Sequence, residues 1–173
     1  MKTFRTICLA LVAAAIIKVT LYGAPVDPTA LYKAGEIEVK AIAFTDTADF
    51  RDFDSGGGIA GNYWLTQNLG LGLEAKTLDT RHAFFDTLGA NVAARFPLGD
   101  SGFAPFGKVG FDWNAEASSS PQARAQFELY LGGGIEKRFS HGITAGVEAR
   151  ILRDSEFREN EHYQFSVFVG KAF

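Results

Sequence analysis

Apolar and polar residues alternate with a period of two along most of the chain after residue 35. No convincing stretch has the 3.6-residue spacing of an amphipathic helix. Between residues 143 and 151, for example, odd-numbered positions hold Ile, Ala, Val, Ala and Ile, while even-numbered positions hold Thr, Gly, Glu and Arg. Such alternation predicts strands with one apolar and one polar face, and therefore an all-β protein.

The alternating segments predict eight strands separated by turns. We expect them at residues 36–46, 56–66, 69–79, 82–96, 102–114, 124–139, 142–154 and 161–173. Each is close to or above the ~10 residues that a tilted strand needs to cross a bilayer. Short turns at 66–68, 97–101 and 140–142 alternate with mostly longer links, although the link near residues 80–81 is also tight. This arrangement favours an eight-stranded antiparallel up-and-down transmembrane β-barrel, with short turns at one end and most longer loops at the other.

One hairpin and the C-terminal strand carry a family resemblance. The sequence from Gly56 to Glu74, GGGIAGNYWLTQNLGLGLE, resembles the second hairpin of the small OmpA/OmpX-like outer-membrane β-barrel family. In that family the last strand ends in an aromatic residue preceded by apolar residues at every second position. The matching residues here are Phe165, Val167, Val169 and Phe173. Lys171 departs from the pattern, and we expect its side chain to reach water at the membrane interface.

The resemblance, which spans about residues 36–173, implies a location and partners. It implies an integral protein of the outer membrane in a Gram-negative envelope, surrounded by outer-membrane lipids including lipopolysaccharide. It also implies partners during biogenesis, namely periplasmic chaperones and a barrel-assembly machinery that reads the C-terminal strand. It does not identify an external ligand. The net charge of −3 gives no indication of nucleic-acid binding.

The N-terminus has the layout of a secretory leader. Lys2 and Arg5 precede an apolar run from Ile7 to Ile17, so residues 1–23 are expected to be a signal peptide. A cut after Ala24 would put Tyr22 at the −3 position, and a cut after Gly23 would put Leu21 there, so no small residue defines the cleavage site. An uncleaved single-span anchor is the alternative. Residues 24–35 have no strand pattern, and we expect a short periplasmic segment there. The single cysteine, Cys8, lies within the leader, so the mature protein forms no internal disulfide.

The polar face of the strands is rich in charge. Parity places seven acidic and six basic residues there: Glu36, Glu38, Lys40, Glu74, Lys76, Arg95, Lys108, Asp112, Glu128, Glu136, Arg138, Glu148 and Arg150. An eight-stranded barrel has room mainly for side chains. We therefore expect a structural network that plugs the interior. Counting from the short turns sets Lys40, Glu74, Lys108 and Glu148 at similar heights, with Arg95, Glu136 and Arg138 nearer the turns.

Aromatic residues are expected in two interfacial bands. Phe96, Phe103, Phe139 and Phe173 fall near the short turns, and Phe84, Phe111, Trp113 and Tyr163 fall toward the longer loops. We attribute the glycine runs at 56–58 and 132–134 to close packing or bending of strands rather than to phosphate binding.

No motif predicts a catalytic, cofactor or metal site. The sequence has no Cys/His metal pattern and no Gly-x-Ser-x-Gly elbow. His82 and His162 lack a serine two residues later, as a barrel deacylase would carry, and His141 falls in a short turn. The aspartates at 46, 49, 52 and 54 could hold a cation that bridges lipopolysaccharide, but a solvated loop is the simpler interpretation.

Four functional hypotheses remain from the sequence. The first is a structural or surface-interaction protein of the outer membrane, which is not an enzyme. The second is a narrow porin-like channel in which interior ion pairs exchange partners, and the third is an enzyme acting on lipid A. The fourth is a soluble lipocalin-like barrel with its faces inverted, because alternation alone does not say which face lies inside.

Overall fold

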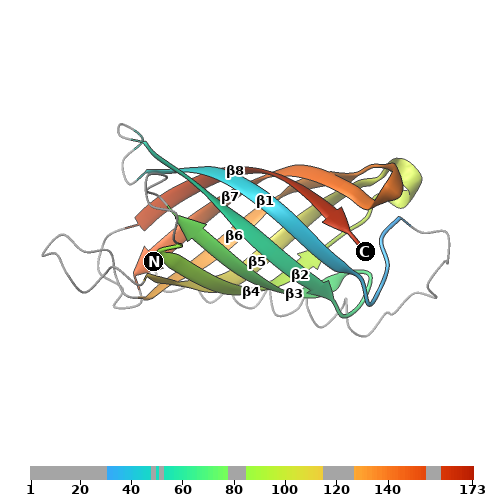
Figure 1. The fold of residues 1–173 in the computed structure, drawn as a ribbon, viewed down its shortest axis with the longest axis horizontal. Coiled ribbons are helices and arrows are strands. Elements are labelled where there is room, and N and C mark those ends of the chain that lie inside the picture. Colours follow the sequence, from blue (N-terminus) through green and yellow to red (C-terminus); the bar gives the residue numbers. More distant parts are fainter. Residues whose placement is uncertain (1–30, 48–49, 51–52, 78–84, 115–126, 155–160) are drawn as a thin grey trace, which may run out of the picture.

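Eight antiparallel strands close into one barrel in which each strand pairs with its neighbours in sequence (Figure 1). This computed structural model describes residues 31–47, 50, 53–77, 85–114, 127–154 and 161–173. The strands are β1 (Ile37–Thr47), β2 (Asp54–Trp64), β3 (Leu69–Thr77), β4 (Thr87–Arg95), β5 (Phe103–Asn114), β6 (Phe127–Arg138), β7 (Ile143–Asp154) and β8 (Glu161–Ala172). The predicted eight-stranded antiparallel fold is confirmed. The predicted signal peptide lies outside the described residues, within which no helix is long and apolar enough to cross a membrane.

Closure depends on the pairing of the first and last strands. β1 and β8 run antiparallel from the pair Glu38 and Ala172 to the pair Thr47 and Tyr163. The amide of Phe173 continues the ladder by donating to the carbonyl oxygen of Ile37 at 2.9 Å. Closure leaves no strand with an unpaired edge, as a sheet in hydrocarbon requires, because unpaired backbone groups there cost several kcal/mol each.

Most predicted strand boundaries lie within two residues of the observed ones. β2 ends at Trp64 rather than residue 66, because the Thr66 hydroxyl accepts hydrogen bonds from the amides of Asn68 and Leu69 and forms the turn. β5 and β7 each begin one residue later than predicted, after Gly102 and Gly142, whose positive φ angles belong to turns. β4 begins at residue 87 rather than 82, and residues 82–84 lie outside the described part.

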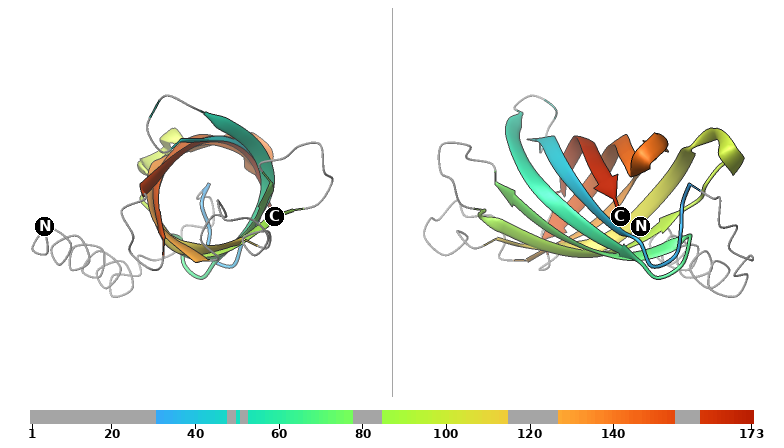
Figure 2. Two further views of the ribbon diagram at one scale, coloured as in Figure 1. Left: turned by 90° about the vertical axis from the view of Figure 1, so that its left-hand side faces the viewer. Right: turned by 45° about the vertical axis from the view of Figure 1, so that its right-hand side comes forward.

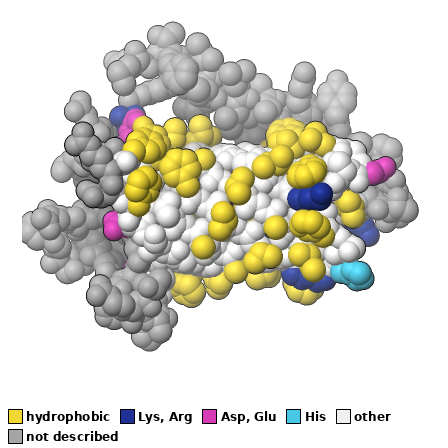
Figure 3. All heavy atoms as spheres, turned by 90° about the horizontal axis from the view of Figure 1, so that it is seen from above, with side chains coloured by type: hydrophobic (Ala, Val, Ile, Leu, Met, Phe, Trp, Pro, Cys, Tyr) yellow, Lys and Arg dark blue, Asp and Glu magenta, His cyan; other side chains and the backbone are white. Residues whose placement is uncertain are grey.

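The two faces of the wall differ as the alternation predicts. Large apolar side chains point outward and are exposed, including Leu73 at 69% and Val167 at 57%. Hydrophobic side chains are scattered over the face seen in Figure 3 and gather toward its two ends. Of the predicted aromatic bands, Phe96, Phe103, Phe139 and Phe173 are exposed at the turn end and Phe111 at the loop end, whereas Phe84 lies outside the described residues.

Five aromatic rings on the inner face each lie opposite a glycine of the neighbouring strand. The pairs are Phe44 with Gly56, Trp64 with Gly70, Phe106 with Gly134, Tyr130 with Gly110, and Phe168 with Gly146. A Cβ atom on any of these glycines would lie 2.5–2.8 Å from a ring carbon. The glycines therefore provide the space in which the rings lie flat against the wall.

Adding one methyl group at such a glycine should destabilise the barrel. We expect Gly146→Ala to lower the free energy of unfolding by about 1–3 kcal/mol, because its Cβ would overlap Phe168 and the backbone of β6. Gly107→Ala is the matched control, since its Cβ would point away from the interior and meet nothing nearer than 3.8 Å. Urea unfolding in lipid vesicles measures the free energy of unfolding of each variant. Equal losses in the two variants would contradict the role given to the glycine opposite the ring.

Candidate functional site: the barrel interior

The eleven charged residues of the predicted network all face the interior and are buried. Each is at most 6% exposed: Glu38, Lys40, Glu74, Lys76, Arg95, Lys108, Glu128, Glu136, Arg138, Glu148 and Arg150. Glu36 and Asp112, which parity also placed there, are 8% and 1% exposed. Twelve of the thirteen form two groups that are separate along the barrel, and Glu128 lies at the loop end, where it accepts a hydrogen bond from Asn114 Nδ2.

The first group, the turn-end cluster, contains Glu36, Glu38, Lys40, Arg95, Glu136 and Arg138. Glu36 lies 2.6 Å from Arg95 and 2.7 Å from Arg138. Lys40 lies 3.1 Å from Glu38 and 3.0 Å from Glu136. Longer contacts, Arg138 to Glu38 at 3.6 Å and Arg95 to Glu136 at 4.0 Å, complete the cluster. Three carboxylates face three cations, so the cluster is neutral as a unit.

The second group, the central cluster, contains Glu74, Lys76, Lys108, Asp112, Glu148 and Arg150. Arg150 binds Glu74 through two nitrogens at 2.6 and 2.8 Å and lies 2.5 Å from Glu148. Lys108 lies 3.0 Å from Glu148 and 3.4 Å from Glu74. Lys76 lies 2.5 Å from Asp112. This cluster also has three carboxylates and three cations, which limits the cost of burying each charge.

Two aromatic rings lie between the clusters. Phe106 and Phe168 meet edge to face, with ring centroids 6.0 Å apart. The ammonium group of Lys40 lies 4.4 Å from the Phe168 centroid, and that of Lys108 lies 5.5 Å from the Phe106 centroid. The Lys40 ammonium group also lies 5.8 Å from the Phe106 centroid, so the ring pair contacts cations of both clusters and lies between them.

The heights expected from counting residues are partly wrong. Glu74, Lys108 and Glu148 do meet in the central cluster, and Arg95, Glu136 and Arg138 lie nearer the turns, as expected. Lys40 does not join the central cluster but pairs with Glu38 and Glu136 below the aromatic layer. Tilted strands are staggered, so equal counts from the turns do not give equal heights around the barrel.

The residues just before β1 fold into the turn end of the barrel, which the sequence did not predict. We call residues 31–36 the N-terminal latch. The Tyr32 side chain is 2% exposed, and its hydroxyl donates to the Gly102 carbonyl oxygen at 2.7 Å. Arg138 Nη1 donates to the Leu31 carbonyl oxygen at 2.8 Å. Viewed along the barrel, this segment lies within the ring of strands (Figure 2).

Cations of the turn-end cluster hold the latch in place. The guanidinium carbons of Arg95 and Arg138 lie 4.5 and 4.3 Å from the centroid of the Tyr32 ring, as cation–π contacts require. Arg95 also lies over Trp64 at 3.6 Å. Burial raises the pKa of the Tyr32 phenol, so the hydroxyl remains protonated and continues to donate at physiological pH.

Groups that could carry out other chemistry are scattered. His162 Nδ1 lies 3.9 Å from Asp46, whereas Ser166 follows four residues later on β8, roughly 13 Å away. His141 lies in the turn between β6 and β7. Asp46 and Asp54 pair across β1 and β2, while Asp49, Asp52 and His82 lie outside the described residues. The described residues contain no group of three potential metal ligands from His, Cys, Asp and Glu.

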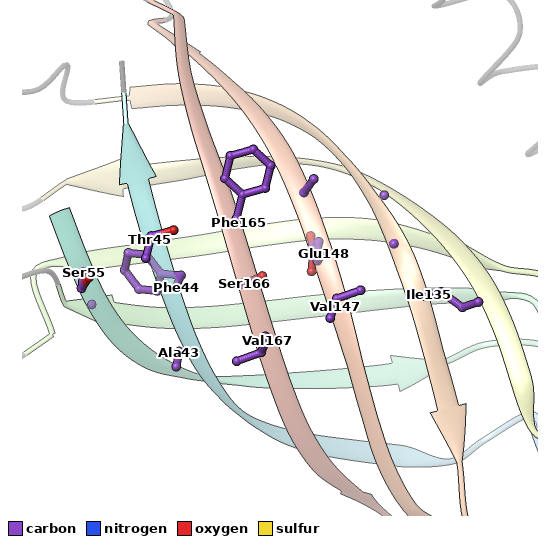
Figure 4. A pocket seen from close by; sticks show the side chains of 14 residues that line it. Ala43, Phe44, Thr45, Ser55, Ile135, Val147, Glu148, Phe165, Ser166 and Val167 are labelled. Carbon is purple, nitrogen blue, oxygen red and sulfur yellow. The ribbon is translucent and has the colours of Figure 1, made fainter. Parts of the chain in front are cut away.

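One apolar depression lies on the outside of the wall. Its lining includes Ile135, Val147, Phe165 and Val167, which are exposed wall residues on β6, β7 and β8 (Figure 4). Ala43 of β1 and Ala149 of β7 also line it. In a bilayer, acyl chains would fill such a depression.

The outward alternation of the last strand includes the four residues predicted to guide assembly. Phe165, Val167, Val169 and Phe173 are 42%, 57%, 55% and 76% exposed. The family model for the outer membrane protein beta-barrel domain matches residues 8–172. The chain belongs to this family. Its place in the outer membrane and the predicted family resemblance are thereby confirmed.

Solved structures share the fold of this outer-membrane barrel. The N-terminal β-barrel domain of Pseudomonas aeruginosa OprF superposes with a TM-score of 0.62 and 16% identity, over 82% of this chain and 99% of that domain. Neisserial surface protein A gives 0.56 and 12%, over 80% and 96% of the two chains. A de novo designed transmembrane β-barrel gives 0.56 and 16%, over 82% and 98%. No curated protein matches the sequence.

Removing one charged side chain of the central cluster should destabilise the folded barrel. We expect Arg150→Met to lower the free energy of unfolding by about 3–5 kcal/mol, because Glu74 and Glu148 lose their shared guanidinium inside the barrel. Arg153→Met is the control on the same strand, since Arg153 is partly exposed and lies 3.6 Å from Glu161. We expect it to cost less than about 1 kcal/mol. Urea titration in vesicles measures both, and a harmless Arg150→Met would contradict the role given to the cluster.

Removing the contacts of the Tyr32 side chain should release the N-terminal latch. Tyr32→Phe removes the hydrogen bond to Gly102 and should lower the local opening free energy by about 1 kcal/mol. Tyr32→Ala also removes the ring beneath the two guanidinium groups and should have a larger effect. Hydrogen exchange at the Gly35 amide, which donates to Trp64, reports the opening. Leu31→Ala is the control. Unchanged exchange of the Gly35 amide in Tyr32→Ala would contradict the role of Tyr32 in holding the latch.

Proposed function

We propose that this outer-membrane barrel is a closed structural element, which anchors in the membrane, contributes to envelope integrity and presents its loops to the surroundings. One observation carries the proposal, namely that the interior is occupied from the turn end to the middle of the barrel. The N-terminal latch and the turn-end cluster fill the turn end, the aromatic layer follows, and the central cluster fills the middle.

Paired charges favour a closed interior over a conducting one. A permeating ion would have to displace a partner from groups such as Arg150 or Lys108, each of which contacts two carboxylates. Opening one contact would leave a charge unpaired in a poorly solvated space, which is costly. The neutrality of both clusters also removes the net field that would concentrate ions of one sign.

A narrow channel is the second candidate, and unpaired polar atoms favour it. Both amide atoms of Asn62, the Tyr130 hydroxyl and the Ser166 hydroxyl are buried and have no hydrogen-bond partner among the described residues. Buried groups of this kind commonly bind internal water. A chain of such waters could support the passage of small ions through exchanging ion pairs.

We propose no catalytic role. Hydrolysis of lipid A through a serine nucleophile needs a serine and a histidine within reach of each other. Ser166 and His162 are separated along β8, as described above, and the His162 imidazole instead neighbours Asp46. We also propose that Phe165, Val167, Val169 and Phe173 guide insertion by the barrel-assembly machinery, after delivery by periplasmic chaperones, into a membrane whose lipids include lipopolysaccharide.

Single-channel recording tests the closed barrel against the channel. In planar bilayers we expect the folded protein to show no sustained conductance, only rare small events, because each cluster holds its charges in pairs. Liposomes containing the protein should likewise exclude small sugars. A large general porin in the same lipids is the positive control, and a shift in gel mobility on boiling shows that the barrel has folded.

Sustained, reproducible current steps from the folded protein would contradict the closed barrel and support the channel. A silent recording from protein that shows no mobility shift on boiling would reflect failed folding, so only folded samples are compared.

A further inference from the structure

Two lysines on the lipid-facing wall stand out from their apolar surroundings. Among the described residues, only Lys137, Arg153 and Lys171 are basic residues on the outward face of the strands. Arg153 lies at the loop end and has Glu161 as a partner at 3.6 Å. Lys137 and Lys171 lie at the turn end, and neither forms an ion pair with a carboxylate among the described residues. Figure 3 shows basic side chains and a histidine among the hydrophobic side chains near one end of the wall.

The sheet register places the two lysines on one strip. Lys137 of β6 lies opposite Ala145 of β7, and Lys171 of β8 lies opposite Ile143, two residues along the same strand. Strand spacing and rise then set their Cα atoms roughly 12 Å apart. Extended lysine side chains span that distance from both sides, so both ammonium groups can reach a single phosphate.

Both side chains make contacts at the turn end of the barrel. The Lys171 ammonium group donates a hydrogen bond to the carbonyl oxygen of His141, in the middle of that turn. The Lys137 ammonium group lies 4.4 Å from the ring centroid of Phe103 and 5.6 Å from that of Phe139, the first residue of the turn. The two cations therefore lie beside the aromatic residues at the membrane interface and retain protons to donate.

We infer that Lys137 and Lys171, with the turn Phe139–Gly142, form a binding site for the headgroup of an anionic glycerophospholipid in the periplasmic leaflet. The inference rests on the family's place in the outer membrane, where short turns face the periplasm. A lysine on the lipid face is unfavourable near the bilayer centre but tolerated at the interface, where it attracts anionic lipid. The neighbouring aromatic rings hold the cations at this depth, and Ile143 and Ala145 offer an apolar surface for the acyl chains.

Binding of phosphatidylglycerol provides the test. The folded protein is placed in nanodiscs of phosphatidylethanolamine with a minor fraction of phosphatidylglycerol, and native mass spectrometry counts the lipids that stay bound. We expect wild type to retain phosphatidylglycerol preferentially. Lys137→Gln and Lys171→Gln should each reduce the preference about fivefold, and the double variant more. Lys137→Arg/Lys171→Arg should retain the preference.

Lys33→Gln is the matched control, because Lys33 is exposed at the same end but belongs to the latch rather than the wall. If Lys33→Gln reduced the preference for phosphatidylglycerol as much as the wall variants do, the proposed site would be overturned, since net charge alone would then explain the preference. The absence of any preference in folded wild type, or its survival in the double variant, would also overturn it. A stronger, lysine-dependent retention of lipid A than of phosphatidylglycerol would refute the assignment to the periplasmic leaflet. The mobility shift on boiling is recorded for every variant, so failure to form a membrane barrel is recognised separately.

Discussion

The need to satisfy every backbone hydrogen bond in hydrocarbon determines most of this structure. Pairing of β1 with β8 removes the two edges that an open sheet would expose to lipid. With eight strands the closed ring encloses a space that only side chains can fill. Because alternate residues face lipid and must be apolar, the remaining residues carry the charges, and those charges meet inside. The neutral clusters thus follow from closure combined with alternation.

Burial of charge in this interior has a structural benefit besides stability. Buried ion pairs contribute little stability compared with well-packed apolar groups, but they can specify one arrangement among several. A slip of two residues between strands would keep the apolar face toward lipid, so alternation alone does not forbid it. Such a slip would separate Glu74 from Arg150 and Lys40 from Glu136, which come from different strands. The two clusters therefore help to fix the register of the barrel.

The sequence was sufficient for the fold and for dividing the side chains between two faces, and the family resemblance indicated which face lies inside. Alternation depends on the period of the strand, which is read directly from the chain, so residues such as Glu38 and Glu148 were assigned to the inner face. Ion-pair partners across the barrel were not predictable, because they depend on the stagger between strands. Lys40 was accordingly predicted to lie level with the central cluster, too far from the turn end. The N-terminal latch was missed because residues 31–36 have no periodicity. An isolated Tyr32 next to the first strand was the one available signal, and it acquires meaning only with Arg95 and Arg138 in place.

The pairing of inner-face aromatic rings with glycines restricts how the family can diverge. A ring such as Phe168 can be lost first, because its disappearance leaves empty space opposite Gly146. Gly146 cannot be replaced first, because any side chain there meets both the ring and the backbone. The glycine stays fixed even after the ring is lost, because a Cβ atom at Gly146 would still lie 2.6 Å from the carbonyl oxygen of Ile135. Relatives that have lost the glycine but kept the ring should therefore be rare, whereas relatives that kept the glycine and lost the ring mark positions where an ancestral barrel once held an aromatic side chain.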